Sequence, residues 1–263
     1  MLDCKLLHLK SIYSLILITV ICIIGSIPIS CSKDVVKGPY NSENYYKEAL
    51  KLIDNKDYKE AREYLNEIKN RDETIEYAPL AQIKIAETHS LNDEPELAIE
   101  EYREFLRIFP SHKYTVYAQF QIASTYYDQI EGHDREYSAA GFAIDEFNKL
   151  QLTYPRNPYS DIIKVRISQC KDILANHENY VGEYYYKKGS YDSAISRYLF
   201  IIKNYPDFSE IQKIYYNIGL TYLEKNEDSA RASAKEYFKK AIELATDSKI
   251  TNKAKKELQS LKN

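Results

Sequence analysis

Small residues recur at a regular interval along this chain, and their spacing predicts how it folds. The first set has successive spacings of 37, 37, 59 and 37 residues. Its members are Ala49, Ala86, Ala123, Gly182 and Gly219, and a second small residue follows each one within 20 positions, at Ala61, Ala98, Ala143, Ala194 and Ala234. A small residue lets two helices approach closely, so this register predicts repeated helix–turn–helix units. Such units cannot bury their apolar faces alone and must stack into a solenoid.

The composition agrees with a helical array. Of the 263 residues, 44% are hydrophobic and 29% are charged, and the chain has only 7 glycines and 8 prolines. This scarcity of turn residues argues against a β fold, so we expect an all-α protein. The net charge of −3 supplies no basic face and gives no support for nucleic-acid binding.

The first thirty residues have the pattern of a secretory signal. Two lysines precede an apolar run over residues 12–24, and Cys31 stands where a cleavage site is expected. This arrangement resembles the lipobox of bacterial lipoproteins, which implies a lipoprotein signal peptide over residues 1–30 and acylation of Cys31. An uncleaved transmembrane anchor over residues 11–30 is the alternative, since that stretch is nearly long enough to span a bilayer.

The other cysteines fit the lipoprotein interpretation. Cys4 and Cys22 lie in the segment that would be removed, and Cys31 would carry the lipid. Cys170 is then left without a partner, so we expect no internal disulfide and a small buried side chain at that position. Because Ser32 follows the acylated cysteine, the resemblance implies delivery to the outer membrane.

The helical units divide the chain into segments. Residues 31–41 form a lipidated linker, and residues 42–159 form an amino-terminal half with repeats 1–3. The apolar periodicity predicts one long helix over residues 160–188. It opens a carboxy-terminal half, residues 160–263, with repeats 4 and 5, and a polar helix over residues 250–261 closes the stack.

Turn residues mark the helix ends. The dipeptides Phe109-Pro110, Tyr154-Pro155 and Tyr205-Pro206 each end the second helix of a unit. The first unit has Asn70-Arg71-Asp72 instead, and Asp57 with Glu60 predicts a capping box at the start of its second helix. The inner turn of the third unit is longer than in the first two units, within residues 131–136.

The repeat markers match the tetratricopeptide pattern of small, aromatic and proline positions. We therefore expect a right-handed superhelical solenoid of five tetratricopeptide repeats with a carboxy-terminal capping helix. Further similarity is carried by the lipobox, the long helix and residues 103–112, 134–136, 143–155 and 184–191. With these features the chain resembles the BamD/ComL family, tetratricopeptide lipoproteins of the outer-membrane β-barrel assembly machinery.

The resemblance implies a non-enzymatic scaffold, lipid-anchored on the periplasmic face of the outer membrane. Its partners would be unfolded outer-membrane proteins, the periplasmic domains of the barrel-forming insertase and other assembly lipoproteins. Arg197 matches an arginine of the family, on the second helix of the fourth repeat, that is associated with the insertase contact. The alternative for Arg197 is an ordinary exposed charge on a helix.

The first helices of tetratricopeptide units line a concave face, and that register can be transferred to this sequence. It selects seven residues in the first three units: Tyr46, Ile53, Ile83, Glu87, Phe120, Ser124 and Tyr127. They lack the Lys/Asn clamp that some tetratricopeptide domains use for peptide carboxylates, and they predict an apolar, aromatic trough for an extended segment. The alternative for each of them is packing against neighbouring turns.

Catalytic patterns are missing from the sequence. It has no Gly-rich phosphate loop, no histidine pair at metal spacing and no Gly-x-Ser-x-Gly elbow, so we expect no enzyme, cofactor or metal. Glu131, His133, Asp134 and Arg135 are better explained as a structural loop than as an acid–base cluster. The rival function is a generic periplasmic tetratricopeptide lipoprotein that organises peptidoglycan or division proteins; a cell-wall enzyme is a third class.

Overall fold

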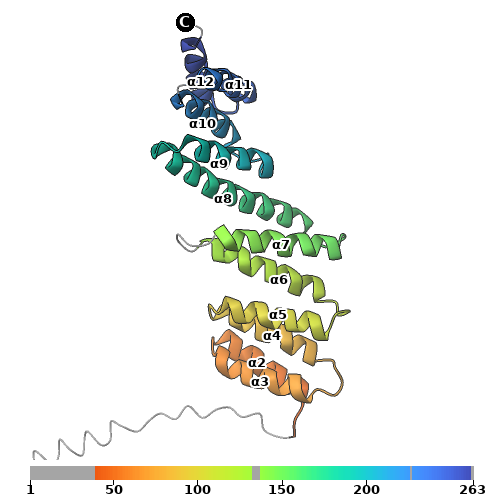
Figure 1. The fold of residues 1–263 in the computed structure, drawn as a ribbon. Coiled ribbons are helices and arrows are strands. Elements are labelled where there is room, and N and C mark those ends of the chain that lie inside the picture. The colour runs from red at the N-terminus through yellow and green to blue at the C-terminus, as the bar shows by residue number, and fades with distance from the viewer. Residues whose placement is uncertain (1–38, 132–136, 226, 262–263) are drawn as a thin grey trace, which may run out of the picture. The chain divides into compact units, whose positions relative to one another are not determined.

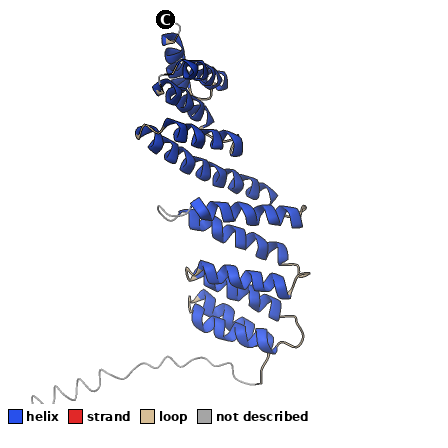
Figure 2. Cartoon of the chain, in the orientation of Figure 1, coloured by secondary structure: helices blue, strands red, loops and turns tan. Residues whose placement is uncertain are grey.

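The computed structural model describes residues 39–131, 137–225 and 227–261. This part of the chain contains eleven α-helices, one short 3₁₀ turn and no β-strand (Figure 1, Figure 2). The predictions for the signal peptide, for Cys31 and for most of the linker concern residues outside these ranges. The same holds for residues 132–136 of the long third turn.

Consecutive helices pack as pairs, and each pair corresponds to one predicted repeat. The pairs are α2 (Ser42–Asp54) with α3 (Tyr58–Arg71), α4 (Ala78–Leu91) with α5 (Pro95–Ile108), α6 (Thr115–Asp128) with α7 (Tyr137–Thr153), α8 (Ser160–Lys187) with α9 (Tyr191–Asn204), and α10 (Ile211–Glu224) with α11 (Asp228–Leu244). The turn η1 (Gln129–Glu131) follows α6, and α12 (Ser248–Ser260) packs on α11. The helical-repeat prediction is confirmed, including the single long helix α8 and the closing helix α12.

The repeated small residues lie in the seams between paired helices. All ten are buried in the structure. In the fourth and fifth units the seam is closed by an aromatic ring: a Cβ atom on Gly182 would lie 2.6 Å from the ring of Tyr198, and one on Gly219 would lie 2.6 Å from the ring of Phe238. These two positions therefore require glycine, because any side chain would overlap a buried ring.

In three units the second helix ends where the prolines predict. Helices α5, α7 and α9 each stop just before the aromatic–proline dipeptide. The first unit uses Asp72 in place of proline. Its carboxylate accepts hydrogen bonds from the backbone N–H groups of Tyr77 at 2.6 Å and Ala78 at 2.8 Å, at the start of α4. The capping box predicted at Asp57 is wrong, because that side chain makes no capping hydrogen bond.

The described residues from Asn41 onward form one compact unit, in which each helix pair also packs on the next pair. Cys170 is fully buried and unpaired, as expected. Helix α7 packs against α8 at the expected boundary between the two halves, and the division at residue 160 stays a prediction. For the site, the consequence is that α8 continues the row of first helices begun by α2, α4 and α6.

Candidate functional site

Three of the predicted trough residues converge on a single arginine that the sequence analysis did not select. Phe120, Ser124 and Tyr127 lie on one side of α6, and Arg166 reaches them from α8. The guanidinium carbon lies 5.4 Å from the ring centroid of Phe120 and 4.8 Å from that of Tyr127. Its Nη1 donates a hydrogen bond to Ser124 Oγ at 2.6 Å. A cation held over two rings is attracted by their negative faces, so this contact fixes the guanidinium in place.

Two further side chains complete this group, which we call the Arg166 cluster: Phe120, Ser124, Tyr127, Tyr159, Arg166 and Gln169. The ring of Tyr159, just before α8, stacks on Phe120 with centroids 4.0 Å apart and an interplanar angle of 13°. The Tyr127 hydroxyl donates to Gln169 Oε1 at 2.7 Å. The cluster therefore combines three aromatic rings with a cation and an amide, and the cation is an addition to the apolar, aromatic trough that the sequence predicts.

A second group forms around Glu87, which we call the Glu87 cluster: Tyr46, Lys84, Glu87, Tyr117 and Gln121. Glu87 accepts hydrogen bonds from the Tyr117 hydroxyl at 2.8 Å and from Lys84 Nζ at 2.6 Å. Gln121 Nε2 donates to the Tyr117 hydroxyl oxygen at 2.7 Å. These bonds join α4 to α6 and leave a polar surface between the second and third units.

The phenols of the Glu87 cluster stay protonated at neutral pH. Burial, reinforced by the negative charge of Glu87, raises the pKa of Tyr46 to about 12. Burial likewise raises the pKa of Tyr117 to about 12. Both groups can therefore donate hydrogen bonds, and neither can act as a base near neutral pH.

The remaining two trough residues pack as the alternative interpretation describes. Ile83 is 5% exposed and belongs to the apolar core of the second and third units. Ile53 is half-buried and packs against the core around Leu65. Neither isoleucine leaves much exposed surface, so the other five predicted trough residues all lie in the two clusters.

Arg197 lies on α9 and pairs within its own unit. Its Nη1 donates to Glu178 Oε2 on α8 at 3.1 Å, and its side chain is 45% exposed. An exposed ion pair of this kind contributes roughly 0–1 kcal/mol to stability. Much of the Arg197 side chain therefore stays available for a contact outside the chain.

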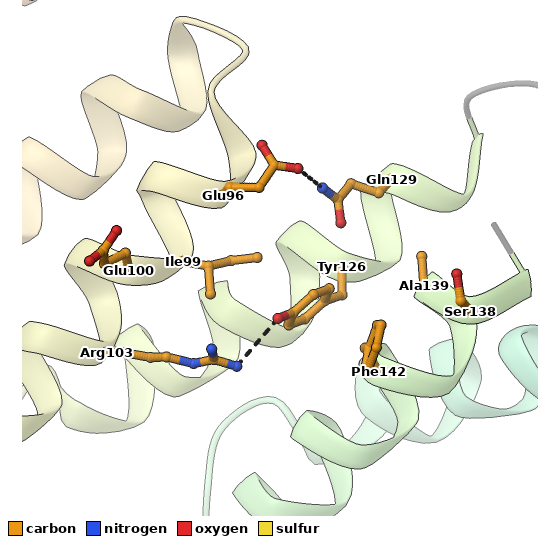
Figure 3. Close-up of a pocket in the computed structure, with 9 residues that line it drawn as sticks. All are labelled: Glu96, Ile99, Glu100, Arg103, Tyr126, Gln129, Ser138, Ala139 and Phe142. Carbon is orange, nitrogen blue, oxygen red and sulfur yellow. Dashed lines mark hydrogen bonds between the residues drawn. The ribbon is translucent and has the colours of Figure 1, made fainter. Parts of the chain in front are cut away.

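A cavity of about 560 Å³, for which the sequence pattern contains no signal, lies between α5, α6 and α7 (Figure 3). Its lining combines Tyr126 and Phe142 with the polar groups of Glu96, Arg103 and Gln129. Arg103 donates to the Tyr126 hydroxyl at 3.3 Å, and Gln129 donates to Glu96 at 3.1 Å. None of the predicted trough residues lines this cavity, because it forms where three helices of two units meet.

The family model YfiO, described as an outer membrane lipoprotein, matches residues 40–236, which is most of the chain. The chain belongs to the YfiO family. The matched range contains both clusters, Arg197 and the long helix α8, so the features described above lie in the part that defines membership.

Relatives of this YfiO-family chain carry a common name. "Outer membrane protein assembly factor BamD" of Rickettsia prowazekii is 26% identical over 68% of this chain and 71% of the relative. The protein of the same name from Haemophilus influenzae is 28% identical over 82% and 87%. The one from Caulobacter vibrioides is 23% identical over 73% and 64%. The resemblance to the BamD/ComL family is confirmed.

Solved tetratricopeptide structures match as well. The structure described as "TPR2AB-domain:pHSP90-complex of yeast Sti1" has a TM-score of 0.44 at 17% identity, over 83% of this chain and 83% of that chain. In the described ranges, a helix with the length and hydrophobicity of a membrane span is absent. The same residues contain no group of three His, Cys, Asp or Glu side chains placed to hold a metal.

Proposed function

We propose that this YfiO-family chain is a non-enzymatic scaffold for the assembly of outer-membrane proteins, held on the periplasmic face of the outer membrane by lipid on Cys31. The observation that carries the proposal is the family match over residues 40–236, together with relatives named as outer membrane protein assembly factors. A row of helix pairs with polar and aromatic clusters between them suits the binding of other polypeptides. The scaffold needs no nucleotide, since burial of apolar surface and the folding of the substrate supply the free energy.

The first three repeats bind extended, aromatic-rich segments of unfolded outer-membrane proteins. The Arg166 cluster supports this assignment, because its rings can pack on an aromatic side chain while its polar groups orient the backbone. The protonated phenols and the carboxylate of the Glu87 cluster supply further hydrogen-bonding groups one unit away. Aromatic and polar contacts that are spread over two clusters can hold an extended polypeptide segment without a deep pocket.

The last two repeats dock to the periplasmic domains of the barrel-forming insertase, next to other assembly lipoproteins. Arg197 is the residue we assign to that contact, by its match to the family arginine. Its exposure supports the assignment, because an exposed guanidinium can form a bidentate pair with a carboxylate of the partner. The internal pair with Glu178 holds the guanidinium in position before docking.

The substrate assignment is tested with Tyr127→Asp and a short synthetic peptide of alternating aromatic and polar residues. We expect the substitution to weaken peptide binding about tenfold or more, because it removes a ring and places a negative charge beside the rings of the cluster. Fluorescence anisotropy of a labelled peptide measures the affinity.

Phe142→Asp is the matched control, since Phe142 is an aromatic residue with 55% exposure that lines the cavity of Figure 3 and lies outside both clusters. It should leave peptide affinity within about twofold of the unsubstituted chain, on the behaviour of residues outside an interface hot spot. Equal affinity of folded Tyr127→Asp and the unsubstituted chain contradicts the assignment.

A further inference from the structure

Arg166 is a half-buried cation without a carboxylate partner in the described part of the chain. Five of the seven other arginines of the same part form ion pairs, and the two that do not, Arg156 and Arg231, are exposed to water. The pairs are Arg62 with Glu94, Arg71 with Glu67, Arg103 with Glu146, Arg107 with Glu104 and Arg197 with Glu178. Arg166 has two rings and one hydroxyl as its contacts. A charge withdrawn from water without a counter-ion is costly, so an anion that binds there gains free energy.

The buried thiol on the same helix does not supply that anion. Cys170 lies one helical turn further along α8, and its thiol is fully buried. Burial raises the pKa of this thiol to about 11, against the opposing effect of Arg166. The sulfur is therefore uncharged at neutral pH, and the positive charge of Arg166 remains uncompensated.

Unused hydrogen-bond donors stand beside this charge. The Arg166 guanidinium has five N–H groups and donates one hydrogen bond, to Ser124. Gln169 lies three residues further along α8, on the same side of the helix, and its Oε1 is occupied by the Tyr127 hydroxyl. That bond directs the Gln169 amide so that its NH₂ group remains for a ligand.

We infer that Arg166 and Gln169 bind a carboxylate of the captured segment, next to an aromatic side chain of that segment that packs on the Arg166 cluster. This inference rests on the proposed function and specifies the substrate class. A guanidinium matches a carboxylate with paired hydrogen bonds, and the rings fix its orientation. The carboxylate can come from the end of a polypeptide chain or from an Asp or Glu side chain.

The experiment compares three peptides that share one sequence of alternating aromatic and polar residues ending in phenylalanine. The first has a free carboxy terminus, the second has a terminal amide, and the third has a terminal amide and a glutamate next to the last phenylalanine. We expect the unsubstituted chain to bind the first or the third peptide about tenfold more tightly than the second, as charge-assisted hydrogen bonds require. Preference for the first peptide identifies a chain terminus, and preference for the third identifies a side chain.

Arg166→Met should abolish that preference, because it removes the charge and keeps an apolar stem. Arg107→Met, which removes an equal charge from α5, should retain the preference. Equal affinity of the unsubstituted chain for all three peptides overturns the inference. If Tyr127→Asp still weakens binding of all three, the proposed function stands while the inference fails; if the unsubstituted chain binds none, both fail.

Discussion

At the scale of single residues, two seams between paired helices are so close that they leave no room for one methyl group. Gly182 and Gly219 are buried inside helices, where glycine lowers helix stability by about 1 kcal/mol relative to alanine. Each nevertheless faces a buried ring at a distance that leaves no space for a Cβ atom. Packing therefore outweighs helix propensity at these two positions.

Gly182→Ala should lower the free energy of unfolding by about 1–2 kcal/mol, because overpacking against Tyr198 costs about 1–3 kcal/mol and the gain in helix propensity offsets only part of it. Urea unfolding followed by circular dichroism measures the change. Gly141→Ala in α7 is the control: a Cβ atom there meets nothing within 4 Å, so it should be neutral or stabilising. Stabilisation by both substitutions contradicts the tight-seam description.

At the scale of elements, the connections between helices depend on buried or partly buried polar side chains. Gln212 on α10 is 1% exposed, donates to Ala241 O on α11 at 2.8 Å and accepts from the backbone N–H of Asp247 at 2.5 Å. It thereby connects α10, α11 and the start of α12. Asp72 likewise connects the first unit to the second. Its carboxylate accepts hydrogen bonds from backbone N–H groups at the start of α4 and from Ser42 Oγ on α2, the latter at 3.2 Å.

Asp72→Ala should cost about 1 kcal/mol of stability at pH 7, the usual effect of losing a helix-capping side chain. Partial burial acts to raise the pKa of Asp72, but hydrogen bonds from Thr74, Ala78 and Tyr77 outweigh it and hold the pKa below its ordinary value. Because the pKa is lower in the folded chain, the Asp72 carboxylate contributes its full stabilisation above its pKa in the unfolded chain, about 3.9. This stabilisation is lost as the pH falls through the pKa of the folded chain.

The difference between Asp72→Ala and the unsubstituted chain should therefore be constant above about pH 5 and shrink in more acidic solution. Urea unfolding over a pH series measures it. Asp57→Ala is the matched control, because Asp57 also precedes a helix but makes no capping hydrogen bond. A loss with Asp72→Ala that does not depend on pH contradicts the role of the carboxylate.

The sequence predicted elements better than it predicted the site. The spacing of small residues and the position of prolines were sufficient for the helix pairs, and the apolar periodicity was sufficient for α8, because these signals act within a few turns of a helix. Arg166 was missed since its contact with Ser124 joins residues 42 positions apart, and it depends on how α8 packs across α6. Ile83 was selected for the trough by the transferred register, yet the packing of its unit buries it.

At the scale of the whole molecule, the helical repeats form the body, and the lipid anchor on Cys31 is a proposal from the sequence. The family match covers the repeats, and the relatives are assembly factors by name. The body contains two surfaces to which we assign different partners. The first consists of the Glu87 cluster and the Arg166 cluster, which joins the third repeat to α8, and the second is the exposed Arg197 on α9. Capture of a substrate by one surface while the insertase is held by the other would bring the two partners together.

The most direct test is affinity purification of the tagged full chain from detergent-solubilised membranes, followed by mass spectrometry. The account predicts recovery of a large barrel protein with repeated periplasmic domains. Arg197→Glu should reduce that recovery about tenfold at matched expression, because it reverses a charge at the contact. Glu178→Gln, which breaks the same internal ion pair and keeps the arginine, should reduce it much less. Recovery of peptidoglycan or division proteins without any barrel protein contradicts the account.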